Sequence, residues 1–269
     1  MIYLTGASGF LGNNLIQFFK TKGIEFKSFS RKKTTNALQI KNYLDIKENP
    51  NATILHLASE SNTKSKMYHD EIEFYKNISK KKWKHQIFFS SAQVYDDQSL
   101  YLKTENSLIN PRNNYGKKKS EIEKIFLEIE NATILRLSNI IGKGMSDRNV
   151  INILLSQLIL GPTIKLENTY SVRDFLAVND FVKILHKIIK SNLTGIFNIS
   201  TGRGTQISQL TDYMIEIVNK FQYRLEVKDI SDSVSHLVLD NTKIKNLCDI
   251  EINSNIKEII RSIIENKKI

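Results

Sequence analysis

Short apolar runs alternate along the chain with segments of helical periodicity. Runs rich in β-branched and aromatic residues predict strands at 2–6, 25–29, 42–46, 52–59, 86–91, 132–140 and 195–200. Apolar residues at helical spacing predict helices over 10–21, about 65–82 and 115–130. Because strands and helices alternate at this spacing, we expect a parallel sheet covered by helices on both faces.

The alternation loosens after about residue 143, where helices are expected near 149–160, 180–190, 206–220 and 255–267. We therefore expect an α/β fold with two parts. The first is a Rossmann-type doubly wound parallel sheet in residues 1–143, to which segments near 174–200 return. The second is a smaller, mainly C-terminal α/β lobe that binds substrate, made of residues 144–173 and 201–269.

Composition narrows the class of protein. A chain of 269 residues, 41% of them hydrophobic, can bury a sizeable core. The chain lacks a basic leader and any run of roughly 18 apolar residues, so we expect a cytoplasmic protein without membrane insertion. The single cysteine, Cys248, permits no internal disulfide and no cysteine metal cluster, and no metal site is expected.

The net charge of +11 is spread along the chain and is not gathered with aromatic residues into one basic module. Such a distribution does not favour a nucleic-acid partner. It is compatible either with solvated lysine-rich faces or with attraction of an anionic substrate.

Three glycines follow the first predicted strand, in the segment TGASGFLG. Gly6 would permit a tight turn, Gly9 would let the backbone approach a pyrophosphate, and Gly12 would let the helix pack on the strand. The N-terminus of that helix offers free N–H groups to an anion. The spacing is G-x-x-G-x-x-G, so the strand-turn-helix context carries the prediction of dinucleotide binding, and plain turn chemistry is the alternative.

Tyr115 and Lys119 lie four residues apart at the start of a predicted helix and so share one face. A nearby ammonium favours the phenolate, so we expect it to lower the pKa of Tyr115 toward a range useful for proton transfer. Lys118 faces nearly the same way, and the spacing cannot choose between the two lysines. Ser90 and Ser91 end a buried strand, where a parallel sheet presents its ligand crevice. A solvated lysine run is the alternative interpretation of the helix.

Several segments together resemble one known family. They are the glycine loop, HLAS at 56–59, SSAQVY at 90–95, YGKKK at 115–119, LRLSNIIG at 135–142 and VRDFLAVND at 172–180. This set resembles the extended short-chain dehydrogenase/reductase family, in particular its nucleotide-sugar epimerases, dehydratases and ketoreductases. The resemblance runs in order from Leu4 to about Gly202.

The resemblance implies roles for individual residues. Ser91 would hydrogen-bond the reacting oxygen of the substrate, Tyr115 would transfer the proton, and Lys119 would hold the nicotinamide ribose. Asn139 and Arg173 would contact the diphosphate of a nucleotide-sugar substrate. Besides the glycines, Tyr115 and Lys119, the implied cofactor contacts are Ser8, Phe10, Leu11, Asp45, Ile46, Leu57, Ala58 and Asn77. For Asp45 and Asn77, ordinary polar surface is the alternative, and a homodimer is a further expectation from the family.

The chain departs from the family pattern at two places. Dehydratases carry an Asp-Glu pair after the active-site hydroxyl, whereas Ala92 and Gln93 follow Ser91 here. Neither residue is an acid, so dehydration is disfavoured. At Lys118 relatives commonly have serine, and the sequence does not indicate what the lysine does.

The segment KSFSRKK stands where NAD-binding relatives place an acidic residue. A carboxylate about 4 Å from a 2′-phosphate would cost on the order of 4 kcal/mol at an effective dielectric of 20. Here Ser30 is neutral, Arg31 offers a planar fork to a phosphate, and Lys32 or Lys33 adds positive charge. We therefore expect a preference for NADP(H), with NAD(H) as the alternative if the loop is merely solvated.

A diffusing NADPH favours net reduction over a cycle on a retained cofactor. We therefore expect reduction of a nucleotide-linked keto sugar, a 4-keto-6-deoxyhexose, to a deoxysugar nucleotide for polysaccharide biosynthesis. The alternatives are a nucleotide-sugar 4-epimerase with retained NAD, and a non-catalytic NADP-binding regulator.

Overall fold

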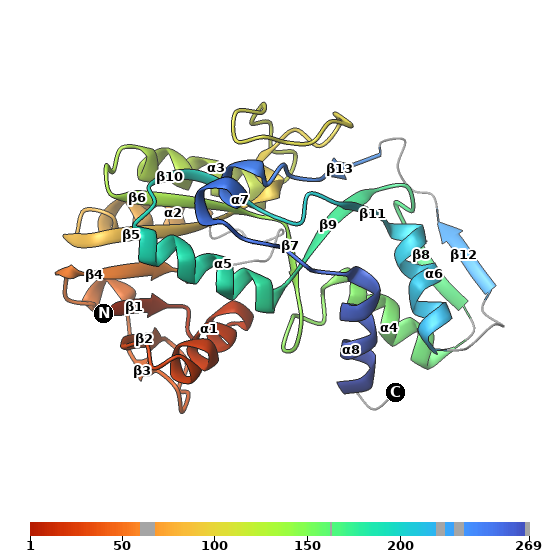
Figure 1. Ribbon diagram of the computed structural model, residues 1–269, viewed down its shortest axis with the longest axis horizontal. Helices are drawn as coiled ribbons and strands as arrows, with labels where there is room; N and C mark the ends of the chain where they lie inside the picture. Colours follow the sequence, from red (N-terminus) through yellow and green to blue (C-terminus); the bar gives the residue numbers. More distant parts are fainter. Residues whose placement is uncertain (60–67, 162, 219–223, 229–233, 267–269) are drawn as a thin grey trace.

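A parallel sheet of seven strands, in the order β10-β6-β5-β4-β1-β2-β3, forms one side of the molecule (Figure 1). The computed structural model describes residues 1–59, 68–161, 163–218, 224–228 and 234–266. The strands are β1 Ile2–Thr5, β2 Phe26–Ser30, β3 Leu38–Gln39, β4 Asn49–His56, β5 Trp83–Ser91, β6 Ala132–Leu137 and β10 Gly195–Ile199. All their pairings are parallel, which confirms the predicted doubly wound fold.

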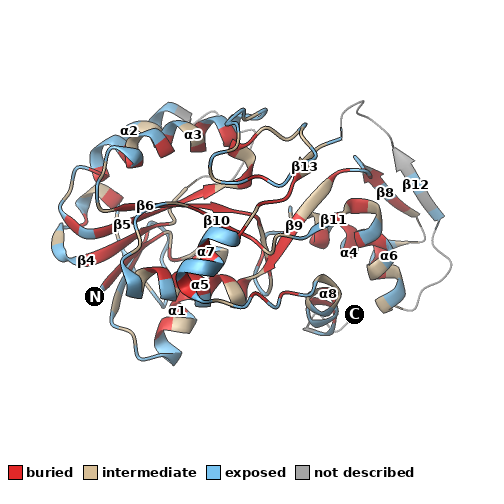
Figure 2. Cartoon of the chain, turned by 45° about the horizontal axis from the view of Figure 1, so that its top comes forward, coloured by how far each residue is buried: buried red, intermediate tan, exposed pale blue. Residues whose placement is uncertain are grey.

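Helices cover both faces of this sheet (Figure 2). One face carries α1 Phe10–Thr21, α5 Val178–Ser191 and α7 Thr242–Cys248. The other carries α2 Tyr68–Ile78 and α3 Asn114–Leu127. The helix predicted over 65–82 thus begins outside the described residues and ends four residues early, at Ile78.

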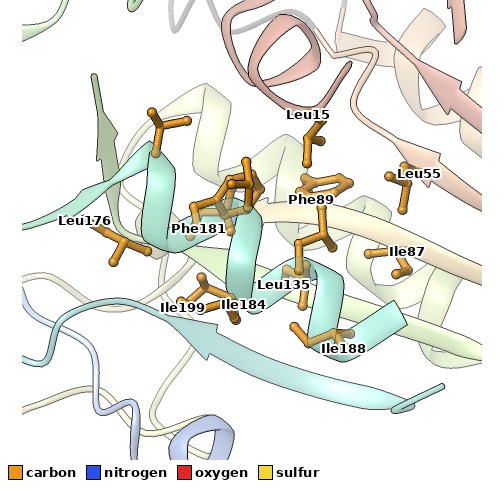
Figure 3. Packing of buried hydrophobic residues seen from close by; sticks show 14 of the residues in the cluster. Leu15, Leu55, Ile87, Phe89, Leu135, Leu176, Phe181, Ile184, Ile188 and Ile199 are labelled. Carbon is orange, nitrogen blue, oxygen red and sulfur yellow. The ribbon is translucent and has the colours of Figure 1, made fainter. Parts of the chain in front are cut away.

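The two cores follow from the period of two in a strand. In β5, Ile87 and Phe89 enter the core on the α1 and α5 side, whereas Phe88 enters the core under α2 and α3. Figure 3 shows Phe89 next to Leu15 of α1, and its ring also contacts that of Phe181 of α5. Since both faces of the sheet are covered, its central strands carry apolar side chains toward both cores, as expected for a parallel sheet.

The second part of the chain has its own sheets and core. A four-stranded sheet contains β7 Asn139–Ile141, β9 Val172–Ala177, β11 Gly204–Gln206 and β13 His236–Leu237, and a two-stranded sheet pairs β8 Thr163–Glu167 with β12 Arg224–Lys228. The helices α4 Val150–Leu160, α6 Ile207–Val218 and α8 Ile256–Asn266 pack in this part. Its apolar cluster includes Leu154, Leu210 and Ile260.

One of the predicted strands is absent, and another is divided. Residues 42–46 do not form a strand, because Tyr43–Asp45 form a short 3-10 helix, η1. The Asn42 side chain accepts a hydrogen bond from the Leu44 N–H, and the Asp45 carboxylate accepts one from the Asn42 N–H, which closes a capping box. The strand predicted over 132–140 is divided at Ser138 into β6 and β7, which belong to different sheets.

Three further features bear on function. No helix among the described residues is long and apolar enough to cross a bilayer. Within the same residues, no group of three or more His, Cys, Asp or Glu side chains could hold a metal ion. Cys248 is a buried free thiol.

Candidate active site

The glycine loop after β1 is shaped by contacts that only glycine permits. Gly6 has φ +69°, and a Cβ atom there would lie 2.8 Å from the backbone nitrogen of Ala58 and from the carbonyl carbon of Leu57. A Cβ atom on Gly12 would lie 2.5 Å from the Gly6 carbonyl oxygen. The loop therefore packs directly against the chain that leaves β4, where the sheet presents its carboxyl edge.

The N-terminus of α1 fits an anion. Gly9 is the residue before the helix, no side chain of the described residues caps it, and its first turn holds no acidic residue. The Phe10 and Leu11 side chains pack against apolar clusters, and the half-buried Ser8 accepts a hydrogen bond from Asn13 through its carbonyl. With the close approach at Gly6, this arrangement matches what a dinucleotide pyrophosphate requires.

The structure brings Ser91, Tyr115 and Lys119 together. Ser91 ends β5 and its hydroxyl hydrogen-bonds the Tyr115 side chain. Lys119 follows one turn later in α3, its Nζ 5.7 Å from the Tyr115 ring centre, and donates to the Phe89 carbonyl at 2.7 Å. Ser90 points to the opposite face of the sheet, where its hydroxyl donates to Glu123. Of the two serines, Ser91 therefore faces the crevice.

Gly116 lets α3 come close enough to η2 (Ala92–Val94) for Tyr115 to reach Ser91, and this role was missed from the sequence. A Cβ atom at this position would lie 2.2 Å from the Gln93 carbonyl oxygen and 2.9 Å from Pro111 Cβ. Asn113 caps the helix by accepting from the Gly116 N–H at 2.8 Å. The available signal was a glycine inside a helical turn, where it is unfavourable unless packing requires it.

The pKa of Tyr115 differs from our expectation. Tyr115 keeps some exposed surface, but desolvation by the atoms packed around it, with the Glu71 carboxylate adding to the effect, raises the pKa of Tyr115 to about 12. The hydrogen bond from Ser91 opposes this rise only in part. Burial lowers the pKa of Lys119 to about 8. The lowering of the Tyr115 pKa that we expected is therefore wrong for this structure, because desolvation and the Glu71 carboxylate outweigh the Ser91 hydrogen bond.

The two neighbouring lysines have different partners. Lys118 Nζ lies 2.6 Å from Glu71 Oε2 on α2, and Glu71 also accepts from the Ser59 hydroxyl. Lys119 instead points to the end of β5 through its bond to Phe89. Packing thus distinguishes positions that the spacing left equivalent.

A cavity of about 470 Å³ lies beside the glycine loop, lined by Arg31, Lys41, Asn42, Tyr43, Leu44, Ala58, Ser59, Asp70, Glu71, Glu73, Phe74 and Asn77. The Tyr43 hydroxyl accepts from the Gly6 N–H at 3.2 Å, and the Arg31 guanidinium lies 5.8 Å from the Tyr43 ring centre. Tyr43 was missed because residues 42–46 were predicted as a strand, and Lys41 lies just before that segment. Their only signal was their position just before the Asp45-Ile46 pair.

The other predicted cofactor residues differ in whether they line this cavity. Ser30 is buried at the end of β2, and its hydroxyl accepts from the Lys32 N–H at 3.0 Å. Lys32, Asp45 and Ile46 are not among the lining residues in the described part of the chain. Asp45 serves the capping box, and the Ile46 carbonyl accepts from Lys81. Asn77 lines the cavity, and its side chain donates to Glu73.

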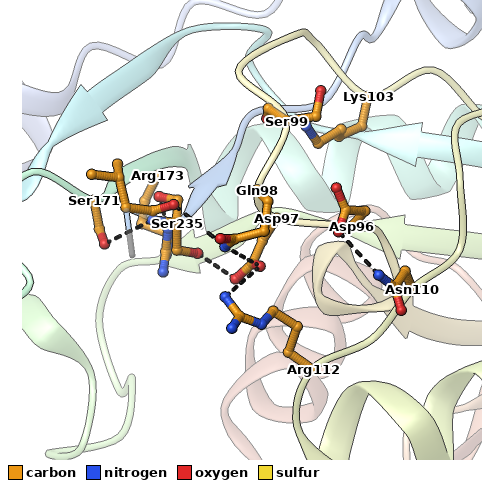
Figure 4. Close-up of polar contacts among 11 residues, drawn as sticks. Asp96, Asp97, Gln98, Ser99, Lys103, Asn110, Arg112, Ser171, Arg173 and Ser235 are labelled. Atoms are coloured by element: carbon orange, nitrogen blue, oxygen red, sulfur yellow. Dashed lines mark hydrogen bonds and ion pairs between the residues drawn. The ribbon is translucent and has the colours of Figure 1, made fainter. Parts of the chain in front are cut away.

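The two predicted substrate residues lie on the second sheet. Asn139, at the start of β7, donates to the Asp174 carbonyl at 3.2 Å. Arg173 of β9 donates through Nη1 to the carbonyls of Val172 and Ser235, at 2.9 and 2.8 Å. Figure 4 shows Arg173 on the side of Ser235 away from Arg112, with Asp97 between them. The structure therefore places them on adjacent paired strands.

With this geometry in view, comparison with known proteins defines the class. Residues 2–200 match the model of the NAD dependent epimerase/dehydratase family. The chain belongs to this family, a branch of the extended short-chain dehydrogenases/reductases.

Individual relatives catalyse different reactions. The chain is 28% identical to GDP-6-deoxy-D-talose 4-dehydrogenase of Aggregatibacter actinomycetemcomitans, over 91% of this chain and 90% of that protein. It is 25% identical to ADP-L-glycero-D-manno-heptose-6-epimerase of Brachyspira hyodysenteriae, over 81% of each.

Solved structures share the fold at lower identity. An NAD-dependent NDP-hexosamine 5,6-dehydratase of tunicamycin biosynthesis has a TM-score of 0.85 at 16% identity, covering 99% of this chain and 97% of that one. UDP-glucose 4-epimerase of Thermotoga maritima, solved with UDP-glucose, has a TM-score of 0.82 at 20% identity, covering 99% and 98%. At these identities the likeness establishes the fold alone.

Proposed function

We propose that the protein reduces a nucleotide-linked keto sugar with NADPH, the substrate being a 4-keto-6-deoxyhexose. The observation that carries the proposal is the Ser91–Tyr115–Lys119 arrangement, in which the pKa of Tyr115 is raised to about 12. A phenol that keeps its proton at neutral pH suits the donor of a reduction. The similarity to GDP-6-deoxy-D-talose 4-dehydrogenase over nine-tenths of the chain supports a keto group at carbon 4 and a 6-deoxy sugar as the substrate.

In this mechanism the chain positions the carbonyl and supplies its proton. The Ser91 and Tyr115 hydroxyls hydrogen-bond the carbonyl oxygen of the sugar. When bound, the nicotinamide supplies the hydride to the carbonyl carbon. As negative charge develops on the oxygen, Tyr115 Oη gives up its proton, and the Lys119 ammonium, one helical turn away, stabilises the phenolate that remains. The protonated Lys119 would also hold the nicotinamide ribose of the cofactor.

The cofactor would be held at the places that fit it. The backbone of Gly9, Phe10, Leu11 and Gly12 would bind the pyrophosphate. Arg31 and Lys41 line the cavity next to Tyr43. Position 30 holds a serine and not an acidic residue. We assign the 2′-phosphate of NADP(H) to these two cations, because a guanidinium and an ammonium favour a phosphate and the neutral Ser30 does not repel it.

The substrate would lie between the sheet edge and the second part of the chain, residues 144–173 and 201–269. Asn139 and Arg173 would bind its diphosphate. Ala92 and Gln93 supply no acid-base pair after Ser91, which argues against dehydration. The product would be a deoxysugar nucleotide, a donor for polysaccharide synthesis.

A nucleotide-sugar epimerase with retained NAD is the second candidate. The similarities to ADP-L-glycero-D-manno-heptose-6-epimerase and, over 45% of the chain at 29% identity, to UDP-glucose 4-epimerase of Lactobacillus helveticus support it. An epimerase oxidises and re-reduces one substrate on the same cofactor. Purified protein should therefore be denatured and the released nucleotide identified, since stoichiometric NAD would favour the epimerase and contradict the reductase.

The direct test measures NADPH consumption with 4-keto-6-deoxyhexoses linked to GDP, dTDP, CDP and UDP. We expect turnover with at least one of them and its loss in Tyr115→Phe, which removes the proton donor and keeps the ring. Unchanged turnover in Tyr115→Phe would contradict the proposed mechanism. A non-catalytic cofactor-binding regulator would show binding of NADPH and no turnover with any keto sugar.

A further inference from the structure

Asp97 is a carboxylate that pairs with Arg112 and is connected to Arg173 through Ser235, where the chain that follows β5 meets the four-stranded sheet. The Ser235 hydroxyl donates to Asp97 Oδ2 at 2.6 Å, and the His236 N–H donates to the Asp97 carbonyl at 2.8 Å. Arg112 Nη1 lies 3.7 Å from Asp97 Oδ1 (Figure 4). Asp97 follows η2 (Ala92–Val94), directly after the catalytic serine, so its charge lies on the substrate side of the sheet.

Arg173 is linked to the same carboxylate through Ser235. Its Nη1 donates to the Ser235 carbonyl at 2.8 Å, while the hydroxyl of that residue holds Asp97. Burial lowers the pKa of Arg173 and the charge of Asp97 opposes this change. Asp97 therefore supplies negative charge to Arg173 from one side and to Arg112 from the other.

We propose that Asp97 is an internal counter-ion that competes with the substrate diphosphate for Arg173 and Arg112, and so limits the affinity for nucleotide sugars. The inference rests on the proposed diphosphate role of Arg173 and adds Arg112 as a second cation, three residues before Tyr115. An arriving diphosphate meets both the attraction of the arginines and the repulsion of Asp97. The carboxylate thus weakens binding of substrate and of product alike, which favours product release.

Whether diphosphate binding becomes tighter or weaker when Asp97 loses its charge distinguishes a counter-ion from a structural contact. Asp97→Asn removes the charge but keeps an oxygen that can accept from the Ser235 hydroxyl. Loss of a purely structural contact would leave binding unchanged or weaken it. Loss of the counter-ion must strengthen it, because the arginines then keep their full positive potential.

A neighbouring carboxylate provides the matched control. Asp96 accepts a hydrogen bond from Asn110 at 3.2 Å, and it is half-buried like Asp97. Asp96→Asn therefore changes the net charge of the protein equally, one residue away. A general effect of charge would appear in both variants, whereas the proposed effect belongs to Asp97.

The experiment measures Kd by calorimetry for UDP, GDP and inorganic pyrophosphate, with the protein saturated with NADP⁺. These probes carry the diphosphate and no sugar that can react. At low salt we expect Asp97→Asn, and Asp97→Ser as a second charge-removing variant, to bind each probe about five- to tenfold more tightly, and the gain to shrink at high salt. We expect Asp96→Asn to stay within about twofold and Arg112→Gln and Arg173→Gln to bind more weakly.

The outcomes separate the inference from the proposed function. Equal or weaker binding by folded Asp97→Asn and Asp97→Ser, with weaker binding by Arg173→Gln, would overturn the counter-ion role alone. An equal gain in Asp96→Asn would also overturn it. Absence of binding of all three probes to the unmodified protein would overturn both the counter-ion and the proposed diphosphate site.

Discussion

Lys118 and Glu71 form a buried ion pair, with 2.6 Å between Nζ and Oε2 and only 5% and 11% of their side chains exposed. The pair joins α3 to α2 beside Tyr115. Lys118, whose role the sequence left open, therefore has a partner of its own on a neighbouring helix.

Breaking this pair should be costly. We expect Lys118→Ser to lower the free energy of unfolding by about 3–5 kcal/mol, because it leaves the Glu71 carboxylate buried without its cation. Adding Glu71→Gln should recover much of the loss, which urea unfolding of the single and double variants would measure. Lys117→Ser, in the exposed neighbouring position, should change stability by about 0.5 kcal/mol or less. Additive effects of the two substitutions would show that the pair is not coupled.

The rate of reduction should fall in mild alkali. Burial lowers the pKa of Lys119 to about 8, so this ammonium is charged below pH 8 and loses its proton as the pH rises through that value. Because Tyr115, with a pKa of about 12, stays protonated throughout, the loss follows the lysine alone. With saturating NADPH, kcat should be level near pH 6–7 and decrease above pH 8.

Lys119→Arg is the control for this profile. An arginine keeps its charge at every pH of the assay, so the decrease near pH 8 should disappear, whatever the residual rate. The same decrease in the variant would assign the titration to another group.

Gly116→Ala should remove most of the activity. A Cβ atom 2.2 Å from the Gln93 carbonyl must push α3 away from η2, and a displacement of about 1 Å between Ser91 and Tyr115 can reduce turnover by about 100-fold. Overpacking should also cost about 1–3 kcal/mol of stability. Gly161→Ala is the matched control, since a Cβ there meets no atom within 4 Å. Equal activity in the two variants would show that the close approach is unnecessary.

We expect Arg31 and Lys41 to determine the preference for NADPH over NADH. We expect Arg31→Ala and Lys41→Ala each to raise the KM for NADPH by about tenfold and to leave the KM for NADH nearly unchanged, because only NADPH carries the 2′-phosphate. Ser30→Asp with Arg31→Ala should move the preference toward NADH. Lys33→Ala, exposed and not among the described lining residues of the cavity, should have little effect. Equal changes for both cofactors would contradict the assignment.

Much of the fold could be predicted because its signals are local. The helix over Phe10–Thr21 is marked by glycines before it and apolar spacing within it, and its bounds agree with the structure. The division of the chain at Ser138 has no local signal, since β6 and β7 differ in the strands that they pair with. Residues 42–46 carry a strand-like pattern, but the polar ends Asn42 and Asp45 bond to each other's backbone.

The candidate site likewise contains residues that the sequence indicates and residues that only the structure reveals. Ser91, Tyr115 and Lys119 were selected by residue type and by position at a strand end or a helix start, and packing brings them together. Gly116 acts through an atom of Gln93 more than twenty residues earlier in the chain, and such a contact is visible only in three dimensions. Lys118 pairs with Glu71 and Lys119 donates to the Phe89 carbonyl, and the sequence reveals neither contact.

The position of β10 at the outer edge of the main sheet has a consequence for biosynthesis. A nascent chain released to residue 143 contains six of the seven strands, yet β6, whose residues are all buried in the finished protein, would stand as an open edge. The face that α5 covers would be bare as well. We therefore expect the main sheet to be completed only after residue 199 has emerged from the ribosome, and the open edge of β6 to favour association with other chains until then.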